Sequence, residues 1–164
     1  MKLKNVYAKS KYQGELEVLT NCKSSIICRT NFFGYGPAHK KSFSEWIEES
    51  AKNNKKIVLF KDVFITPVSG KNLAFCAHKL IENNFSGIFN ISSDKKISKF
   101  DFGKLLCDKL NISSYSIIPG SIDDRLDLVR RPKSMGLSNA KLTKAINNQN
   151  LDIEIQIARI LKNL

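Results

Sequence analysis

Helix-like and strand-like segments alternate along this sequence, and that alternation constrains its fold more than any other feature. Runs of β-branched and aromatic residues at 25–33, 57–60 and 87–91 predict strands. Between them, apolar residues recur at helical spacing in residues 43–51 and 73–81, which predicts helices. Strands that alternate with helices favour an α/β fold with parallel strands.

Local signals refine the boundaries of these elements. Residues 7–19 favour a helix, and Ser42 followed by Glu45 is typical of a capping box at a helix start. Ser98 is expected to begin another helix, whereas Pro67 excludes a central strand and indicates an edge or a loop. Further elements are expected at residues 115–118 (a strand), 123–133 (a charged loop), 138–146 (a helix) and 152–163 (a helix).

The chain has 164 residues, enough for one domain with a real core. Its apolar runs are far shorter than the roughly 18 to 20 residues that span a bilayer, so we expect no membrane segment. No secretory signal is visible, which predicts a cytoplasmic location. The cysteines are scattered without metal-ligand spacing and are expected to be free thiols, with no metal site. They are Cys22, Cys28, Cys76 and Cys107.

The net charge of +12 favours anionic partners. Of 27 basic residues only five are arginine, and the lysines are spread along the chain. Nucleic-acid sites usually combine a clustered basic face with stacking aromatic residues. That pattern is absent, so a nucleic-acid partner is the less favoured alternative, and salt-dependent binding to unspecific DNA would reveal it.

Tyr7 and Lys11 form a candidate catalytic pair. Residues four apart on a helix share one face, so the two side chains can approach each other. A phenol needs its pKa of about 10 lowered by about three units, or roughly 4 kcal/mol, to exchange protons near neutral pH. An ammonium about 4 Å away supplies roughly 4 kcal/mol in a partly closed site but only about 1 in bulk water. The alternative interpretation is an exposed helical turn.

Five stretches of the sequence resemble one enzyme family. Residues 7–15, YAKSKYQGE, resemble the Tyr-Gly-x-Ser/Thr-Lys-x-x-Gly-Glu stretch of the extended short-chain dehydrogenase/reductases. Residues 27–34, ICRTNFFG, are similar to the strand and loop that follow this helix in the dTDP-4-dehydrorhamnose reductase branch. The other matches, in family order, are FITP (64–67) with NLA (72–74), GIFNI (87–91), and RPKSMGL (131–137) before KL (141–142). The resemblance covers nearly the whole chain.

The resemblance implies roles for individual residues. Tyr7 would transfer a proton to or from the sugar carbonyl or hydroxyl, while Lys11 lowers its pKa and holds the nicotinamide ribose. Thr30 and Asn31 would lie near the cofactor, NADP or NAD, and Asn31 and Phe32 near the nucleotide sugar. The family usually has Ser-Trp where this chain has Asn31-Phe32, so the resemblance leaves the identity of the sugar open.

Three arginines in the charged loop are candidate substrate contacts. A guanidinium fork suits paired phosphate oxygens, so Arg125, Arg130 and Arg131 could bind the diphosphate of a nucleotide sugar. Alternatively, these side chains only pin a surface loop.

The family's N-terminal features have no counterpart in this sequence. Its members begin with a Gly-x-x-Gly-x-x-Gly turn that cradles the cofactor diphosphate, and the glycines here nowhere form that spacing. The resemblance therefore implies the C-terminal part of a Rossmann-like NAD(P)-binding fold with a small substrate-binding lobe. In this single partial domain (1–164), residues 1–60 would end the Rossmann-like core and residues 61–164 would mostly form the lobe.

Parallel strands are normally flanked by other strands and covered by helices on both faces of the sheet. Without the N-terminal half, the strand at 25–33 would lack some of these contacts. We therefore expect a marginally stable or aggregation-prone chain unless it pairs with another polypeptide. A separate polypeptide carrying the N-terminal half is the candidate partner.

The leading hypothesis is a partial NAD(P)-dependent nucleotide-sugar reductase of deoxysugar or surface-polysaccharide synthesis. The alternatives are a nucleotide-sugar epimerase or dehydratase fragment, which would use the same Tyr-Lys pair, and a non-catalytic split-gene remnant or binding module. Binding of NAD(P)H would distinguish a competent half-site from a remnant.

Overall fold

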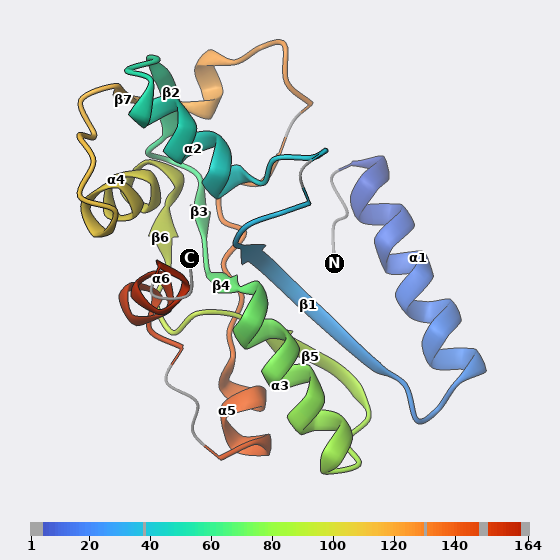
Figure 1. Ribbon diagram of the computed structural model, residues 1–164. Coiled ribbons are helices and arrows are strands. Elements are labelled where there is room, and N and C mark those ends of the chain that lie inside the picture. The colour runs from blue at the N-terminus through green and yellow to red at the C-terminus, as the bar shows by residue number, and fades with distance from the viewer. Residues whose placement is uncertain (1–4, 38, 130, 148–150, 162–164) are drawn as a thin grey trace.

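In the computed structural model, residues 5–37, 39–129, 131–147 and 151–161 are described, and helices and strands alternate through most of the chain (Figure 1). The helices are α1 (Val6–Asn21), α2 (Phe43–Lys52), α3 (Gly70–Glu82), α4 (Lys99–Lys109), α5 (Ala140–Ala145) and α6 (Ile153–Leu161), with a 3-10 turn η1 (Ile122–Asp124). The strands are β1 (Ile26–Phe33), β2 (Ile57–Phe60), β3 (Phe64–Ile65), β4 (Pro67–Ser69), β5 (Gly87–Ile91), β6 (Ile97–Ser98) and β7 (Ile117–Gly120). The α/β class is confirmed.

A parallel sheet forms around β1. Residues Ile26–Thr30 pair with β5, and residues Asn31–Phe33 pair with β4. The connection from β4 to β5 runs through α3, which makes a parallel strand–helix–strand unit of the kind found in Rossmann-like folds. Pro67 stands in β4 at the edge of this sheet, as predicted for a residue without a backbone N–H.

The remaining strands form two small ladders, β2 with β7 in parallel and β3 with β6 antiparallel. The sequence predicts the last parallel strand at 115–118, but β7 begins two residues later, so that boundary is wrong. The physical reason is tertiary: Ile117 pairs with Ile57 and is buried, whereas Tyr115 is 89% exposed. Strand β6 is two residues long and lacks a detectable sequence pattern.

Helix starts follow the predicted caps. The Ser42 side chain accepts a hydrogen bond from the Glu45 backbone, and the Glu45 carboxylate accepts one in return from the Ser42 N–H, which confirms the capping box. Ser98 caps α4, because its side-chain oxygen accepts a hydrogen bond from the Asp101 N–H. Ser69 caps α3.

The buried apolar residues form two cores. One contains Phe102, Ile47 and Leu59 and is enclosed by α2, α4, α6, β2 and β7. The other contains Leu80, Phe89 and Ile91 and joins β4, α3, β5 and α5. Strands on both sides of residue 60 contribute to the sheet around β1, and the division of the chain at that residue stays a prediction.

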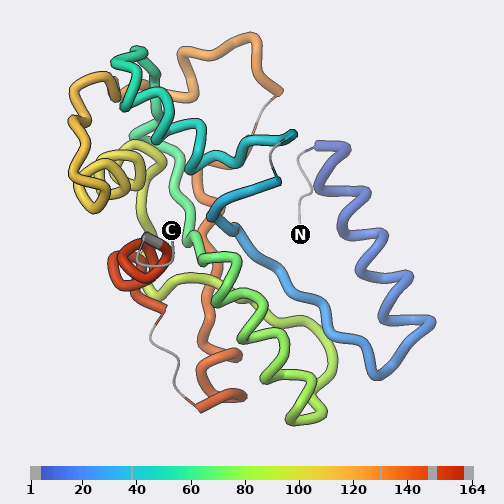
Figure 2. Tube along the Cα trace, viewed as in Figure 1, coloured from blue at the N-terminus to red at the C-terminus, as the bar shows by residue number. Residues whose placement is uncertain are grey.

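Helix α1 stands apart from both cores. It lies on one side of β1, with α3, β4 and β5 on the other (Figures 1 and 2), and none of its residues is buried. Leu16 is 39% exposed, although the sequence places it on the apolar stripe of this helix. Strand β1, which α1 partly covers, is only half-buried from Ile26 to Asn31. One face of the molecule is therefore thinly covered.

The four cysteines are free, as predicted. In the described ranges, no helix has the length and apolarity that crossing a bilayer requires.

Candidate active site

The first two turns of α1 carry the predicted catalytic pair. Asn5 caps the helix, because its side-chain oxygen accepts a hydrogen bond from the Ala8 N–H at 2.9 Å. The Lys11 Nζ lies 5.8 Å from the centroid of the Tyr7 ring, so the two side chains share one helical face. The Tyr7 residue is 70% exposed. The chain thus brings the two side chains together but leaves them exposed to solvent. Proton transfer needs a more enclosed site, which additional protein packed beside Tyr7 would provide.

An ion pair fixes α1 against β1. The Arg29 Nε donates to Glu15 Oε1 at 2.8 Å, and Nη2 donates to Oε2 at 2.5 Å. The hydrogen bonds from Arg29 lower the pKa of the Glu15 carboxyl. Neither residue has a role predicted from the sequence. An arginine within a β-branched strand is the signal that could have revealed the pair, since a half-buried charge needs a partner.

The same ion pair sets the level of Tyr7 along β1. Helix α1 and strand β1 run in opposite directions and meet at Glu15 and Arg29 (Figure 1). Tyr7 lies eight residues before Glu15, or about 12 Å at the helical rise of 1.5 Å per residue. About 12 Å along a strand is three to four residues, which leads from Arg29 to Phe32 and Phe33. Tyr7 is therefore level with the carboxyl end of β1, where open parallel sheets bind ligands.

The carboxyl end of β1 presents the other predicted cofactor and sugar contacts. The Thr30 Oγ1 is buried and has no hydrogen-bond partner in the described structure, so it fits a hydroxyl that binds a ligand. The Asn31 side chain is partly engaged, because its Oδ1 accepts from the Thr66 N–H at 3.5 Å. Phe32 is 69% exposed and lines a hollow of about 330 Å³ with Lys71.

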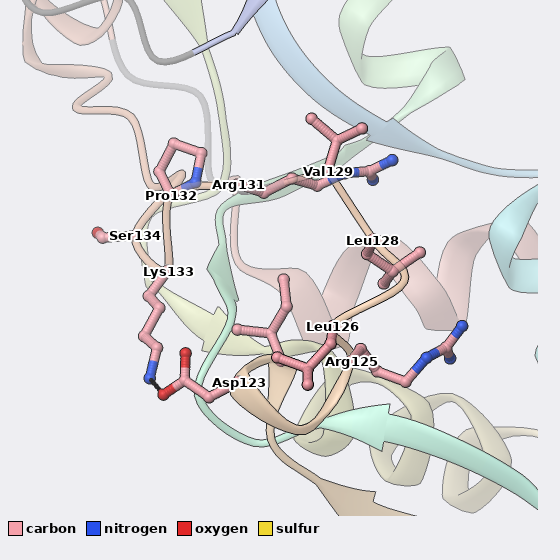
Figure 3. Close-up of a pocket in the computed structure, with 10 residues that line it drawn as sticks. Asp123, Arg125, Leu126, Leu128, Val129, Arg131, Pro132, Lys133 and Ser134 are labelled. Carbon is pink, nitrogen blue, oxygen red and sulfur yellow. Dashed lines mark hydrogen bonds and ion pairs between the residues drawn. The ribbon is translucent and has the colours of Figure 1, made fainter.

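The charged loop forms a cavity of about 690 Å³ (Figure 3). The side chains of Arg125 and Arg131 line it and extend to the right of the view, whereas Lys133, on the left, extends downward and contacts Asp123. The Arg125 fork is occupied by the exposed carboxylate of Asp127, with N···O distances of 2.7 and 2.6 Å. Arg131 makes no ion pair with any residue that the structure describes, so it is the better placed of the two for an anion.

Lys99, the first residue of α4, adds charge that the sequence analysis missed. Burial and the nearby charge of Arg131 lower the pKa of Lys99, and its Nζ lies 5.4 Å from the centroid of the Phe43 ring. Neither Lys99 nor Arg131 forms an ion pair with a carboxylate among the described residues, and two such neighbouring cations favour an anionic ligand. Arg130, the third predicted arginine, lies outside the described residues.

A family model described as the RmlD substrate binding domain matches residues 2–164. The chain belongs to this family. The resemblance recognised in the sequence is thereby confirmed, and it extends over nearly the whole chain.

Known proteins support the assignment. The probable low-salt glycan biosynthesis reductase Agl14 of Haloferax volcanii is 27% identical over 125 residues, or 74% of this chain and 41% of that protein. A dTDP-4-dehydrorhamnose reductase of Bacillus anthracis, solved with NADP, matches with a TM-score of 0.88 at 24% identity and covers 98% of this chain and 56% of its own. A dTDP-glucose 4,6-dehydratase of the same organism, solved with NAD, matches less well, with a TM-score of 0.75 at 13% identity, covering 96% of this chain and 51% of its own.

The chain therefore spans about half the length of the relatives that it matches. The Rossmann-like fold predicted from the sequence is confirmed. The dehydratase resembles this chain less closely in fold than the reductase does.

Proposed function

We propose that this chain is the part of an NAD(P)-dependent nucleotide-sugar reductase that carries the proton-transferring tyrosine and the sugar-nucleotide site. The observation that carries the proposal is the pairing of Tyr7 with Lys11 on one face of α1, level with the carboxyl end of β1. Membership of the RmlD substrate-binding domain family favours a dTDP-linked keto sugar as the substrate. The reaction would serve deoxysugar or surface-polysaccharide synthesis in the cytoplasm.

Each residue of the site has a task in this proposal. As the sugar carbonyl is reduced, its oxygen would take the hydroxyl proton of Tyr7, and the Lys11 ammonium would stabilise the phenolate that remains. A bound nicotinamide cofactor, NADP or NAD, would supply the hydride. Thr30 and Asn31 would lie against that cofactor, with the unpartnered Thr30 hydroxyl as a hydrogen-bonding group. The exposed Phe32 ring would pack against the nucleotide sugar.

Arg131 would bind the diphosphate of the substrate. Its guanidinium lines the loop cavity without a carboxylate partner among the described residues, and a guanidinium fork matches two phosphate oxygens. Arg125 could join it only by releasing Asp127, since both of its paired nitrogens already donate to that carboxylate.

The thinly covered face of α1 and β1 would receive the cofactor-binding half, either as a separate polypeptide or as a segment joined to this chain. Three observations support this partner: α1 has no buried residue, β1 is half-buried, and Val6 and Val18 are exposed by 80% and 45%. The relatives carry in one chain the additional length that such a half would supply. Its packing would also provide the wall that Tyr7 lacks.

The test is reconstitution. The chain is mixed with, or fused behind, the cofactor-binding half of a dTDP-4-dehydrorhamnose reductase, and oxidation of NADPH is followed with dTDP-4-dehydrorhamnose. We expect turnover only when both halves are present. Tyr7→Phe should lower kcat by about a hundredfold or more, because it removes the hydroxyl group that would supply the proton. Tyr12→Phe on the same helix is the matched control and should leave kcat unchanged.

Equal turnover by the Tyr7→Phe mixture would refute the assignment. If the wild-type mixture fails to turn over and the chain binds neither thymidine diphosphate nor the added half, the non-catalytic remnant is the correct interpretation.

A further inference from the structure

The cavity beside Arg131 is built by a single loop. Among the residues that the structure describes, those that line it all lie from Ile122 to Ser134. The two ends of this loop start from different ladders: Gly120 pairs with Phe60 in β2, and Ser134 bridges to Phe64 in β3. The cavity therefore keeps its shape only while the two ends are held at a fixed separation.

One side chain touches both ends. Asp62 stands in the connection between β2 and β3, and its carboxylate accepts from Ser121 Oγ at 2.7 Å and from the Ile122 N–H at 3.0 Å. At the other end of the loop, the Lys133 Nζ lies 3.0 Å from Asp62 Oδ2 and also contacts Asp123. Asp62 thus contacts residues at both the beginning and the end of the loop.

The carboxylate of Asp62 is suited to this fastening. Burial alone would raise the pKa of Asp62, but the hydrogen bonds from Ser121 and Ile122 and the charge of Lys133 outweigh that effect and hold it well below its ordinary range. The group therefore remains ionised near neutral pH, and charge-assisted hydrogen bonds are stronger than neutral ones. Its side chain is only 22% exposed, which limits competition from water.

We propose that Asp62 is a positioning residue for the sugar-nucleotide site: it fastens Ser121, Ile122 and Lys133 together and so holds Arg131 toward the cavity. The fastening stands on the contacts alone, whereas its consequence for nucleotide binding rests on the proposed function. Asp62 itself contacts no substrate in this proposal and acts through the loop.

Two measurements on the full chain test the inference: amide hydrogen exchange over residues 121–129, and the affinity for thymidine diphosphate. Asp62→Ala should accelerate exchange of the loop amides about tenfold or more and weaken nucleotide binding by a similar factor, because bonds to a charged group are lost. Asp62→Asn should have a smaller effect, since the amide oxygen can still accept from Ile122. Asp94→Ala is the matched control: Asp94 also accepts from a side chain, Asn139, and from a backbone N–H, that of Leu151, outside this loop.

Unchanged loop exchange in Asp62→Ala would overturn the fastening, and faster exchange with undiminished nucleotide affinity would overturn the positioning role. If the wild-type chain binds no thymidine diphosphate, the proposed function fails, while the exchange result still decides the fastening. Should Asp62→Ala fail to fold, Lys133→Met offers a second route. This substitution removes the exposed ammonium through which Asp62 contacts the far end of the loop. It should accelerate exchange by a smaller factor than Asp62→Ala would.

Discussion

The ion pair between Glu15 and Arg29 should decide how firmly α1 is held, and therefore where Tyr7 lies. Helix α1 has no buried residue, and an isolated helix of its length is marginal in water. Its attachment to β1 thus depends strongly on this bidentate contact. We expect Glu15→Gln and Arg29→Met each to loosen α1 without unfolding the two cores.

The magnitude follows from the geometry. Two unit charges about 4 Å apart attract by roughly 4 kcal/mol near a protein surface and by about 1 kcal/mol in water. The Glu15 side chain is 17% exposed and that of Arg29 is 35% exposed, so the pair lies between these limits and solvent screening discounts the larger figure. After the cost of desolvation, we expect a coupling free energy of about 1 to 2 kcal/mol. That coupling corresponds to about a five- to thirtyfold change in the opening of α1.

Amide hydrogen exchange of α1, measured for the two single variants and the double variant, gives the coupling directly. Glu17→Gln is the control, because Glu17 is an exposed residue of the same helix and its carboxylate accepts a hydrogen bond from Gln13 within that helix. A coupling below about 0.3 kcal/mol in the double-mutant cycle, or exchange accelerated as much by Glu17→Gln as by Glu15→Gln, would show that the ion pair does not hold α1.

The same pair predicts a pH dependence. The pKa of Glu15 is lowered in the folded chain, so its contribution is fully present above the ordinary glutamate pKa of about 4.3 and is lost as the pH falls through the lower folded value. Exchange of α1, corrected for the intrinsic effect of pH, should therefore accelerate in acid in the wild type. Glu15→Gln should show no such acceleration.

Three further substitutions test the packing and the caps. Gly103→Ala should lower the free energy of unfolding by about 1 to 3 kcal/mol, because the added Cβ would overlap the buried Leu59 side chain; a chemical denaturation curve measures this. Gln156→Leu should cost about 2 kcal/mol or more in the same assay, since the buried amide accepts from the Ser69 N–H and donates to a backbone carbonyl, and both groups would lose their partner. Asn5→Ala removes the cap of α1 and should accelerate amide exchange in its first turn about fivefold while leaving the unfolding midpoint nearly unchanged.

The elements that the sequence predicts well are those fixed by local chemistry. The capping box at Ser42 and Glu45, the cap at Ser98 and the β-branched run of β1 each act within a few residues, so their signals are readable without the fold. Strand β7 was misplaced because its register is set by β2, sixty residues earlier in the chain. A local sequence pattern does not reveal the register of two strands that are so far apart in the chain.

In the candidate site, too, contacts between residues close in the sequence were predictable and contacts between distant residues were not. Tyr7 and Lys11 share a helical turn, and their approach was predictable from spacing alone. Asp62 and Lys133 were not predictable, because the contact between them joins residues 71 positions apart and each looks like an ordinary surface charge in the sequence. Arg125 shows the opposite case, since Asp127, two residues away, could have been recognised as its partner.

Helix α1, which carries Tyr7, lies outside the two apolar cores of the chain. Both cores are built from β1 onward, and no residue of α1 enters either one among the described residues. The loop with Arg131 is fastened to β2 and β3 beside the first core, so its shape does not depend on α1. Tyr7, in contrast, lies on the element that the chain holds least. If the proposed function holds, nucleotide binding would therefore belong to this chain by itself, whereas proton transfer would require a partner that packs against α1.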